Sequence, residues 1–213
     1  MEGLDPPQMR VLGCLLEKQQ TTPDAYPLTL NSLRTACNQA TSRDPVVDYD
    51  EATVREAAQK LGRRGFARLA SYHGSRSPKY RHLLDEKLGT SPDEEALLSV
   101  LMLRGPQTLG ELKQRSERLH PFADLTSVEE TLGRLTVREL GRWLERMPGQ
   151  KEARYMHLFG AETPGVAEAT PTDAQPSSPE LEAPDLAGEV ARLRRELDAL
   201  RQDVDALRDE LSS

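Results

Sequence analysis

Apolar residues recur at helical spacing near the start of the chain, and the same pattern returns in its middle. In both places it follows a capping residue and a proline, Asp5 with Pro6 and Ser91 with Pro92. Gln or Glu three positions after the cap completes a capping-box pattern, which predicts the first turn of a helix. The apolar faces of these helices are Val11, Leu12, Leu15 and Leu16, and Leu97, Leu98, Leu101 and Met102.

Two further helices are predicted in each half. The second helices begin at Thr29 and Thr108, and the third helices begin near Asp50 and at Thr126. Thr108 and Thr126 are each followed by Glu three residues later, again a capping box. The predicted buried faces are Leu30, Leu33 and Cys37; Leu109 and Leu112; Val54, Ala58 and Leu61; and Val128, Leu132 and Leu135.

Each half closes with a strand–turn–strand signal, whose second strand has the form basic-Tyr-x-His-Leu-apolar. The first strands span 66–72 and 142–146, and the second strands span 79–84 and 154–159. Three helices followed by a hairpin is the winged-helix order. Its twofold occurrence predicts a mainly α fold with small β-hairpins (α+β), built from two tandem winged-helix domains at 1–88 and 89–159. Each is small, so we expect the two to pack together.

Several strings along these two halves carry a specific family resemblance. They are RVLGCLLEK at 10–18, YPL at 26–28, ACNQ at 36–39, RDPV at 43–46, LRGPQT at 103–108, GEL at 110–112, RL at 118–119, PG at 148–149, Glu152, RY at 154–155 and HL at 157–158. In this order they resemble the bacterial YceH-like proteins over residues 10–159. The resemblance implies a tandem winged-helix fold and no particular function.

The composition changes at Gly160. Residues 160–184 contain five prolines, five acidic residues and no Lys, Arg or aromatic residue, so we expect a disordered linker. In residues 185–213 apolar positions alternate in steps of four and three, which predicts a coiled coil. Opposite charges at flanking positions, such as Glu189 and Arg194, favour a parallel homodimer. The alternative is a single amphipathic helix that docks on the body. The predicted dimerisation residues are Leu186, Val190, Leu193, Leu197, Leu200, Val204, Leu207 and Leu211.

The net charge of -7 belongs to the tail, because residues 1–159 carry 23 basic against 22 acidic residues, whereas 160–213 carry 5 against 13. Within the body, the 28 residues between Glu56 and Asp85 include no acidic residue. They cover the end of the third helix and the first wing, and a basic wing favours contact with a phosphate backbone. The predicted nucleic-acid-binding residues are Arg63, Arg64, Arg68, Arg76, Lys79 and Arg81. The alternative is a solvated basic face that pairs with acids elsewhere in the body.

Acidic residues occupy the first turns of both third helices, where a recognition helix usually meets base edges: Asp50 and Glu51, and Glu129 and Glu130. We therefore predict a dimeric protein that binds nucleic acid through its first wing, in a largely backbone-directed way. Winged helices also dock proteins. The competing hypothesis is a non-enzymatic scaffold in which the tandem domains bind an unidentified partner protein.

No catalytic residue, metal site or cofactor is predicted. A thiol–imidazole pair would need Cys37 with His82 or His157, but Cys37 falls on an apolar helix face and the histidines are expected to cap the wing strands. Two Cys and four His without short ligand spacing do not indicate a metal centre.

The long loop at 39–49 contains polar residues that we expect to tie it to the domain. Asn38, Arg43 and Asp44 are the residues concerned, with a partner surface as the alternative. The chain shows no signal-peptide pattern and no apolar run of membrane-spanning length. These features predict a cytoplasmic protein that does not bind membranes.

Overall fold

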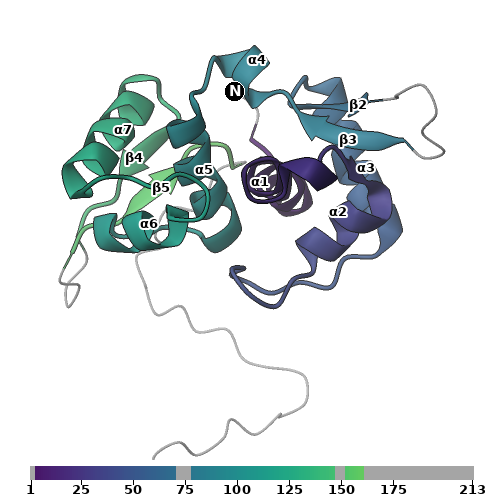
Figure 1. Cartoon of the computed structure of the whole chain (residues 1–213), viewed down its shortest axis with the longest axis horizontal. Helices are drawn as coiled ribbons and strands as arrows, with labels where there is room; N and C mark the ends of the chain where they lie inside the picture. The colour runs from purple at the N-terminus through teal and green to yellow at the C-terminus, as the bar shows by residue number, and fades with distance from the viewer. Residues whose placement is uncertain (1–2, 71–77, 147–151, 161–213) are drawn as a thin grey trace, which may run out of the picture. The chain divides into compact units, whose positions relative to one another are not determined.

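The computed structural model describes residues 3–70, 78–146 and 152–160 of the 213-residue chain. In these ranges the fold is mixed, with seven α-helices, one 3-10 helix and five strands in two small antiparallel sheets (Figure 1). The predicted linker from residue 161 onward, and the whole predicted dimer seam, lie outside the described residues. Within the described ranges, no helix is both long enough and apolar enough to cross a bilayer.

The first repeat, from α1 to β3, contains three helices followed by a hairpin. Its main elements are α1 (Pro6–Thr21), α2 (Leu30–Cys37), α3 (Glu51–Arg63), β2 (Ala67–Ala70) and β3 (Lys79–His82). Between α1 and α2 lie the 3-10 helix η1 (Pro23–Ala25) and the two-residue strand β1 (Leu28–Thr29). Strand β1 pairs with β3, so the sheet has the order β1-β3-β2.

The second repeat, from α5 to β5, has the same order. Its elements are α5 (Pro92–Arg104), α6 (Leu109–Ser116), α7 (Leu125–Val137), β4 (Gly141–Trp143) and β5 (Tyr155–His157). Gln107 occupies the place of β1 and forms a single antiparallel bridge with Tyr155, each N–H donating to the other carbonyl at 3.0 and 2.7 Å. The unpredicted helix α4 (Leu84–Leu88) joins the repeats and ends at Gly89, whose φ of 64° suits glycine.

Most helices begin where the capping residues predict. The predicted caps at Asp5, Thr29, Asp50, Ser91 and Thr108 all precede helices, and Ser91 and Thr108 form capping boxes. The side chains of Asp5 and Asp50 accept the N–H groups of Gln8 and Thr53, both at 2.8 Å. These bonds satisfy amides that have no partner within the helix.

The predicted start of α7 at Thr126 is wrong. The helix begins at Leu125, and Asp124 caps it by accepting the N–H of Ser127 at 2.8 Å. Aspartate is at least as good a cap as threonine. Because Asp124 lies two residues before Thr126, the helix is two residues longer at its start. The capping box predicted between Thr126 and Glu129 is therefore replaced by one between Asp124 and Ser127.

The strands are shorter than predicted. Strand β3 ends at His82 because Leu84 already begins α4, and in the second repeat β5 ends at His157. Strand β4 begins one residue early, at Gly141, and ends at Trp143.

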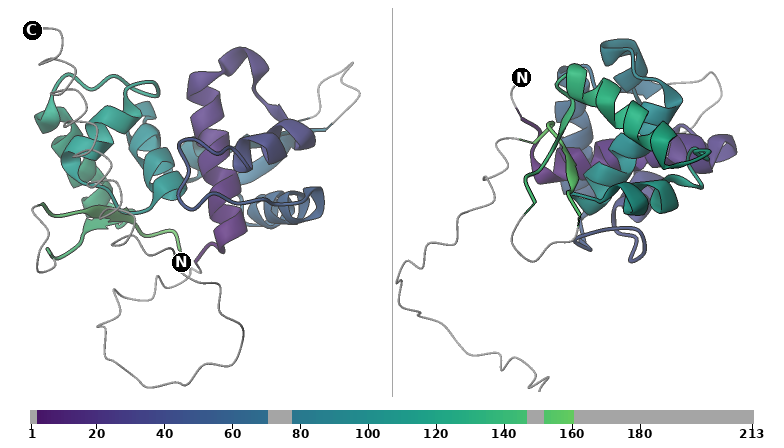
Figure 2. Two further views of the ribbon diagram at one scale, coloured as in Figure 1. Left: turned by 90° about the horizontal axis from the view of Figure 1, so that it is seen from below. Right: turned by 90° about the vertical axis from the view of Figure 1, so that its left-hand side faces the viewer.

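The two repeats pack together through α1 and α5, which lie side by side (Figure 2). A Cβ at Gly13 of α1 would lie 3.0 Å from the Leu103 side chain and 3.1 Å from that of Met102. The Ser99 hydroxyl donates to the carbonyl of Gly13 at 3.2 Å. The absence of a side chain at Gly13 thus permits the close approach, and one continuous cluster of buried apolar residues includes both repeats.

Candidate nucleic-acid interface

The basic residues of the first hairpin gather on its outer face. Arg68 of β2 stands directly opposite Arg81 of β3, and Ala70 stands opposite Lys79. Directly opposite residues of an antiparallel pair project from the same face, and alternate residues project from opposite faces. The intervening pairs are therefore on the inner face, where Ala67, Tyr80 and His82 are buried and Leu69 remains 54% exposed.

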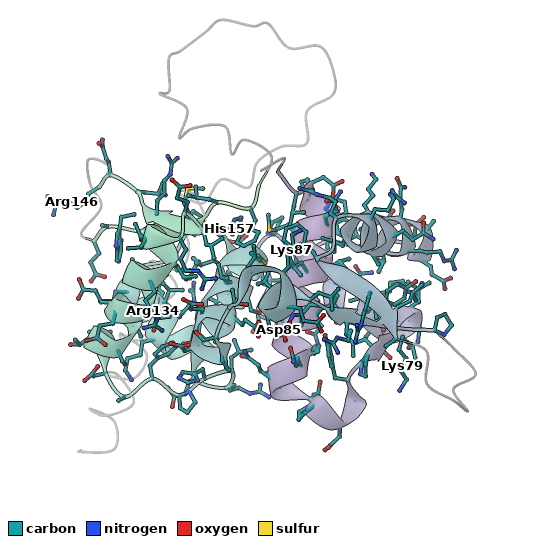
Figure 3. The ribbon with its side chains drawn as sticks, turned by 90° about the horizontal axis from the view of Figure 1, so that it is seen from above. Lys79, Asp85, Lys87, Arg134, Arg146 and His157 are labelled. Carbon is teal, nitrogen blue, oxygen red and sulfur yellow. The ribbon has the colours of Figure 1, made fainter. Side chains whose placement is uncertain are left out.

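Three of the predicted contact residues have no hydrogen-bond or ion-pair partner in the described part of the chain. Arg63, the last residue of α3, and Arg68 are exposed. Lys79, the first residue of the central strand β3, is half-buried (Figure 3). Arg76 lies outside the described residues. Like charges directly opposite each other destabilise a strand pair unless another charge compensates them.

Arg64 has a different position and partners. Its Nη1 donates to the carbonyl of Gly3 and to Oε1 of Gln8, both at 3.0 Å, and its guanidinium lies 5.7 Å from the centroid of the Phe66 ring. Arg138 occupies the equivalent position after α7 and donates to Glu94 at 2.6 Å. In both repeats this arginine ties the end of the third helix to the start of the first helix, which is a structural role.

Arg81 is partly compensated by α4. Its Nη2 pairs with the Glu86 carboxylate, and its side chain is 26% exposed. Lys87, which follows Glu86 in α4, has its ammonium group 4.8 Å from the centroid of the Phe66 ring. Helix α4 therefore places Glu86 and Lys87 beside the hairpin, and its other acid, Asp85, lies 3.9 Å from Nδ1 of His82 (Figure 3).

The solvent face of α3 carries charges that pair with each other. Arg55 pairs with Glu51, and Lys60 pairs with Glu56 at 3.0 Å and with Asp5 at 3.6 Å. This face therefore presents little net positive charge. The expectation that acids in the first turn of α3 disfavour base reading agrees with this arrangement.

Histidines end the closing strands of both repeats in the same way. Nδ1 of His82 accepts the N–H of Leu84 at 3.2 Å, and Nδ1 of His157 accepts the N–H of Phe159 at 3.3 Å. The predicted capping by these histidines is thus confirmed. Burial lowers the pKa of both imidazoles to about 4, so each is neutral near pH 7.

The fold brings together a His, an Asp and a Glu that are separated along the chain. Candidate ligand atoms of His82, Asp85 and Glu95 all lie within 4.8 Å of one another. Thr90 donates to Glu95 at 2.8 Å, and Nε2 of His82 contacts Oε1 of Gln19. Burial raises the pKa of Glu95 to about 7. An ion here would have to displace a hydrogen bond of His82, and we assign no metal to the cluster.

Cys14 and Cys37 are both buried, do not form a disulfide, and lie next to each other in the fold. Cys37 forms a side-chain hydrogen bond with Cys14, and Nη2 of Arg43 donates to Sγ of Cys14 at 3.6 Å. Burial acts to raise the pKa of Cys14, but the Cys37 hydrogen bond and the Arg43 charge bring it below its ordinary value. The thiol of Cys37 thus meets a second thiol, and its predicted place on the apolar helix face is confirmed.

The long loop after α2 is held by the polar residues that the sequence analysis identified. Asn38 donates to the carbonyl of Tyr49 at 2.8 Å and accepts its N–H at 2.9 Å. The N–H of Asp44 donates to the carbonyl of Leu103 at 2.8 Å, which joins the loop to the second repeat. The side chain of Arg43, within the loop, is buried and donates to the carbonyl of Ala36 in α2. The predicted attachment of this loop to the domain is therefore confirmed.

Comparison with known proteins places the chain among uncharacterised bacterial proteins. Residues 4–150 match the family described as "Protein of unknown function, DUF480". The chain is similar to a UPF0502 protein of Pelobacter propionicus, with 48% identity over 202 residues, covering 88% of this chain and 92% of that protein. It is also similar to UPF0502 protein GSU0233 of Geobacter sulfurreducens, 54% identical over 157 residues (73% and 71% covered).

A UPF0502 protein of Stenotrophomonas maltophilia is 45% identical over 190 residues, covering 89% of this chain and 87% of that protein. Residues 1–160 make up about three-quarters of the chain. Alignments that cover 88% or 89% must therefore extend into the acidic tail. The family suggested by the motif strings is confirmed, and the similarity is not confined to the two repeats.

Proposed function

The chain belongs to the DUF480 family, which includes the UPF0502 proteins, and we propose that it binds nucleic acid through the outer face of its first hairpin. The contact is directed mainly at the phosphate backbone. The residues that make it are Arg68, Lys79 and Arg81 of the hairpin, Arg63 at the end of α3, and Arg76, which lies outside the described residues.

The arrangement of elements supports a winged-helix assignment for both repeats. The first has three helices, a short strand between the first two and a hairpin, with the sheet order β1-β3-β2. The second has the same order, with the Gln107 bridge in place of the short strand. This order of elements supports the proposal because a helix-turn-helix variant with a wing has three helices followed by a hairpin.

The cross-strand pair of Arg68 and Arg81 is the observation that carries the proposal. Two arginines directly opposite each other, with Lys79 on the same face, form a cationic surface, and within the described residues its one ion pair is that of Arg81 with Glu86. A phosphate backbone supplies charges of the opposite sign along a line. Backbone contact also agrees with the paired charges on α3, which leave that helix poorly suited to base reading.

Fluorescence anisotropy of the full chain with a random-sequence duplex tests the proposal. The test variant is Arg68→Glu with Lys79→Glu. The matched control is Arg142→Glu with Arg146→Glu, which makes the same charge change at exposed positions of the second hairpin. Circular dichroism of each variant confirms that it is folded.

With five phosphate contacts, the affinity falls about 500-fold between about 50 and about 200 mM salt, because counterions are released on binding. The first-hairpin variant retains three of those contacts, so its affinity falls only about 40-fold over the same range. The control keeps the wild-type salt dependence. Salt-insensitive binding by the wild type, or equal losses in the two variants, would overturn the proposal.

A second candidate function is protein docking by the second repeat. Leu125 and Val137, at the two ends of α7, are 47% and 85% exposed, and Trp143 of β4 is 39% exposed. The equivalent positions of α3 are the charged residues Glu51 and Arg63. Large exposed apolar side chains favour contact with a protein surface. Val137→Asp would abolish such docking and leave duplex binding unchanged, which separates the two functions.

We further propose that the chain is a cytoplasmic binding protein without catalytic activity and that it forms a parallel homodimer through residues 185–213. The heptad pattern supports the dimer. Two bodies joined by a tether would add weak phosphate contacts through a high effective concentration. Light scattering of the full chain tests the dimer against a variant with Leu197→Glu and Leu200→Glu, for which we expect a monomer. A monomeric wild type at high concentration would exclude it.

A further inference from the structure

A polar hollow lies where the two repeats meet, away from the hairpin. Its volume is about 230 Å³, and α1, the start of the long loop, α5, α6 and the turn after α6 surround it. Four of its lining residues are cationic: Lys18, Arg104, Arg115 and Arg118. No residue of β2 or β3 lines it, so it is separate from the proposed nucleic-acid interface.

The acids near this hollow are too few to balance its cations. Glu17 is shared between Lys18 at 3.1 Å and the buried Arg43 at 2.7 Å. Glu111 is likewise shared between Arg115 at 3.4 Å and Arg154 at 2.9 Å.

Arg104 and Arg118 have no ion-pair or hydrogen-bond partner for their side chains among the described residues. Arg104 is half-buried and Arg118 is exposed. The pKa of Arg104 lies below its ordinary value because of burial and because of the neighbouring charges of Arg115 and Arg43. Glu17 and Asp44 act in the opposite direction without reversing the shift. Cations are thus held close together at some electrostatic cost, which a bound anion would relieve.

The other lining groups suit an oxyanion. The hydroxyl-bearing residues Thr41 and Ser42 are exposed at the start of the long loop, beside the guanidinium groups. Arginine binds phosphate oxygens with two parallel hydrogen bonds, and hydroxyl groups add further donors. The hollow is smaller than the pockets of roughly 300–1,000 Å³ that hold drug-sized ligands, so its ligand is small.

We propose that this hollow binds a small phosphorylated molecule, with Arg104 and Arg118 as its main phosphate ligands. Because the lining comes from both repeats, the bound molecule would bridge them. Occupancy would then stabilise the packing of α1 against α5, and through it the relative position of the two hairpins.

Isothermal titration calorimetry of the full chain at low salt tests this site, with inorganic pyrophosphate and adenosine 5′-monophosphate as probes. The test variant is Arg104→Gln with Arg118→Gln. The control variant is Arg142→Gln with Arg146→Gln, which removes the same charge from the second hairpin. Thermal unfolding of each protein, with and without probe, reports folding and the stabilisation by the bound molecule.

We expect the wild type and the control to bind at least one probe with the same affinity, and the test variant to lose about tenfold in affinity for each arginine removed. The bound probe would raise the unfolding temperature of the wild type and the control only. Failure of the wild type to bind either probe, or equal weakening in both variants, would overturn the proposal. Displacement of the probe by duplex DNA would also overturn it, because the hollow would then belong to a nucleic-acid surface.

Discussion

Replacement of the buried Arg43 is the sharpest test of how the first repeat is held together. Its side chain is 0% exposed and forms a bidentate pair with Glu17, at 3.0 and 2.7 Å. It also donates to the carbonyls of Ala36 and Ser42, both at 2.9 Å, and to Gln39 at 2.8 Å. One guanidinium thus connects α1, the end of α2 and the long loop.

Arg43→Ala would leave the Glu17 carboxylate and the Ala36 carbonyl without their main partner. Breaking a buried ion pair from one side costs about 3–5 kcal/mol, and we expect about 3 kcal/mol because Lys18 still lies near Glu17. Arg43→Lys keeps the charge but cannot form the bidentate pair, and we expect a loss of about 1–2 kcal/mol. The Arg55→Ala control, at an exposed pair with Glu51, should cost less than about 0.5 kcal/mol.

Urea unfolding of the full chain, followed by circular dichroism at pH 7 and one fixed protein concentration, measures these differences. A fixed concentration is needed because any dimerisation would make the midpoint depend on it. A loss of about 3 kcal/mol corresponds to a fall in Tm of about 6–12 °C for a domain of this size. If Arg43→Ala and Arg55→Ala prove equally mild, the ion pair does not hold the loop and the reasoning is refuted.

Four other substitutions have directions that follow from the structure. Gly141→Ala should destabilise the protein by about 2–3 kcal/mol, because the new Cβ would clash with the buried Tyr155 ring. Gly133→Ala, with nothing within 4 Å of the new Cβ, should stabilise it by about 0.5–1 kcal/mol, and thermal unfolding separates the two variants. The pKa of His157 is lowered from 6.5 to about 4, so the unfolded protein binds this proton more readily than the folded protein. The free energy of unfolding is therefore highest above pH 6.5 and falls by up to about 3 kcal/mol as the pH falls toward 4. His157→Gln should reduce that acid loss in urea titrations at a series of pH values, and an unchanged profile would count against a neutral buried imidazole. The pKa of Glu95 is instead raised from 4.5 to about 7, so the stability of the folded protein falls as the pH rises across that range. Glu95→Gln should make the protein more stable above pH 7, by up to ~2 kcal/mol after solvent screening. A variant less stable than the wild type above pH 7 would contradict this.

Much of the local structure follows from short-range chemistry. The Asp5-Pro6 and Ser91-Pro92 pairs begin helices because a side-chain oxygen and a proline satisfy the first turn without help from the rest of the fold. Every apolar residue predicted for the faces of α3 and α7 is buried, since their spacing matches the helical period. The one wrong helix start, at Thr126, lies where Asp124 offered an equally good cap.

The candidate site was less predictable, because charge along a sequence does not show which side chains have partners. Arg64 and Arg81 stood in the same acid-free segment as Arg68, yet Arg64 bonds to Gln8 of α1 and Arg81 pairs with Glu86. The repeat did contain a signal for Arg64, since Arg138 takes the equivalent place after α7. The alignment of the two third helices would have pointed to a shared structural role.

The amino-acid sequence by itself determined the elements of the two repeats, because caps, prolines and helical periodicity act over a few residues. It also predicted the hydrogen-bonding residues of the long loop. Only the tertiary structure decided which charged side chains remain available to bind a ligand. The approach of α1 to α5 at Gly13 brings Arg104 and Arg118 to a hollow with Thr41 and Ser42, and strand pairing sets Arg68 opposite Arg81. Such contacts depend on the packing of segments that are far apart in the chain. The spacing of residues within one segment therefore does not predict them.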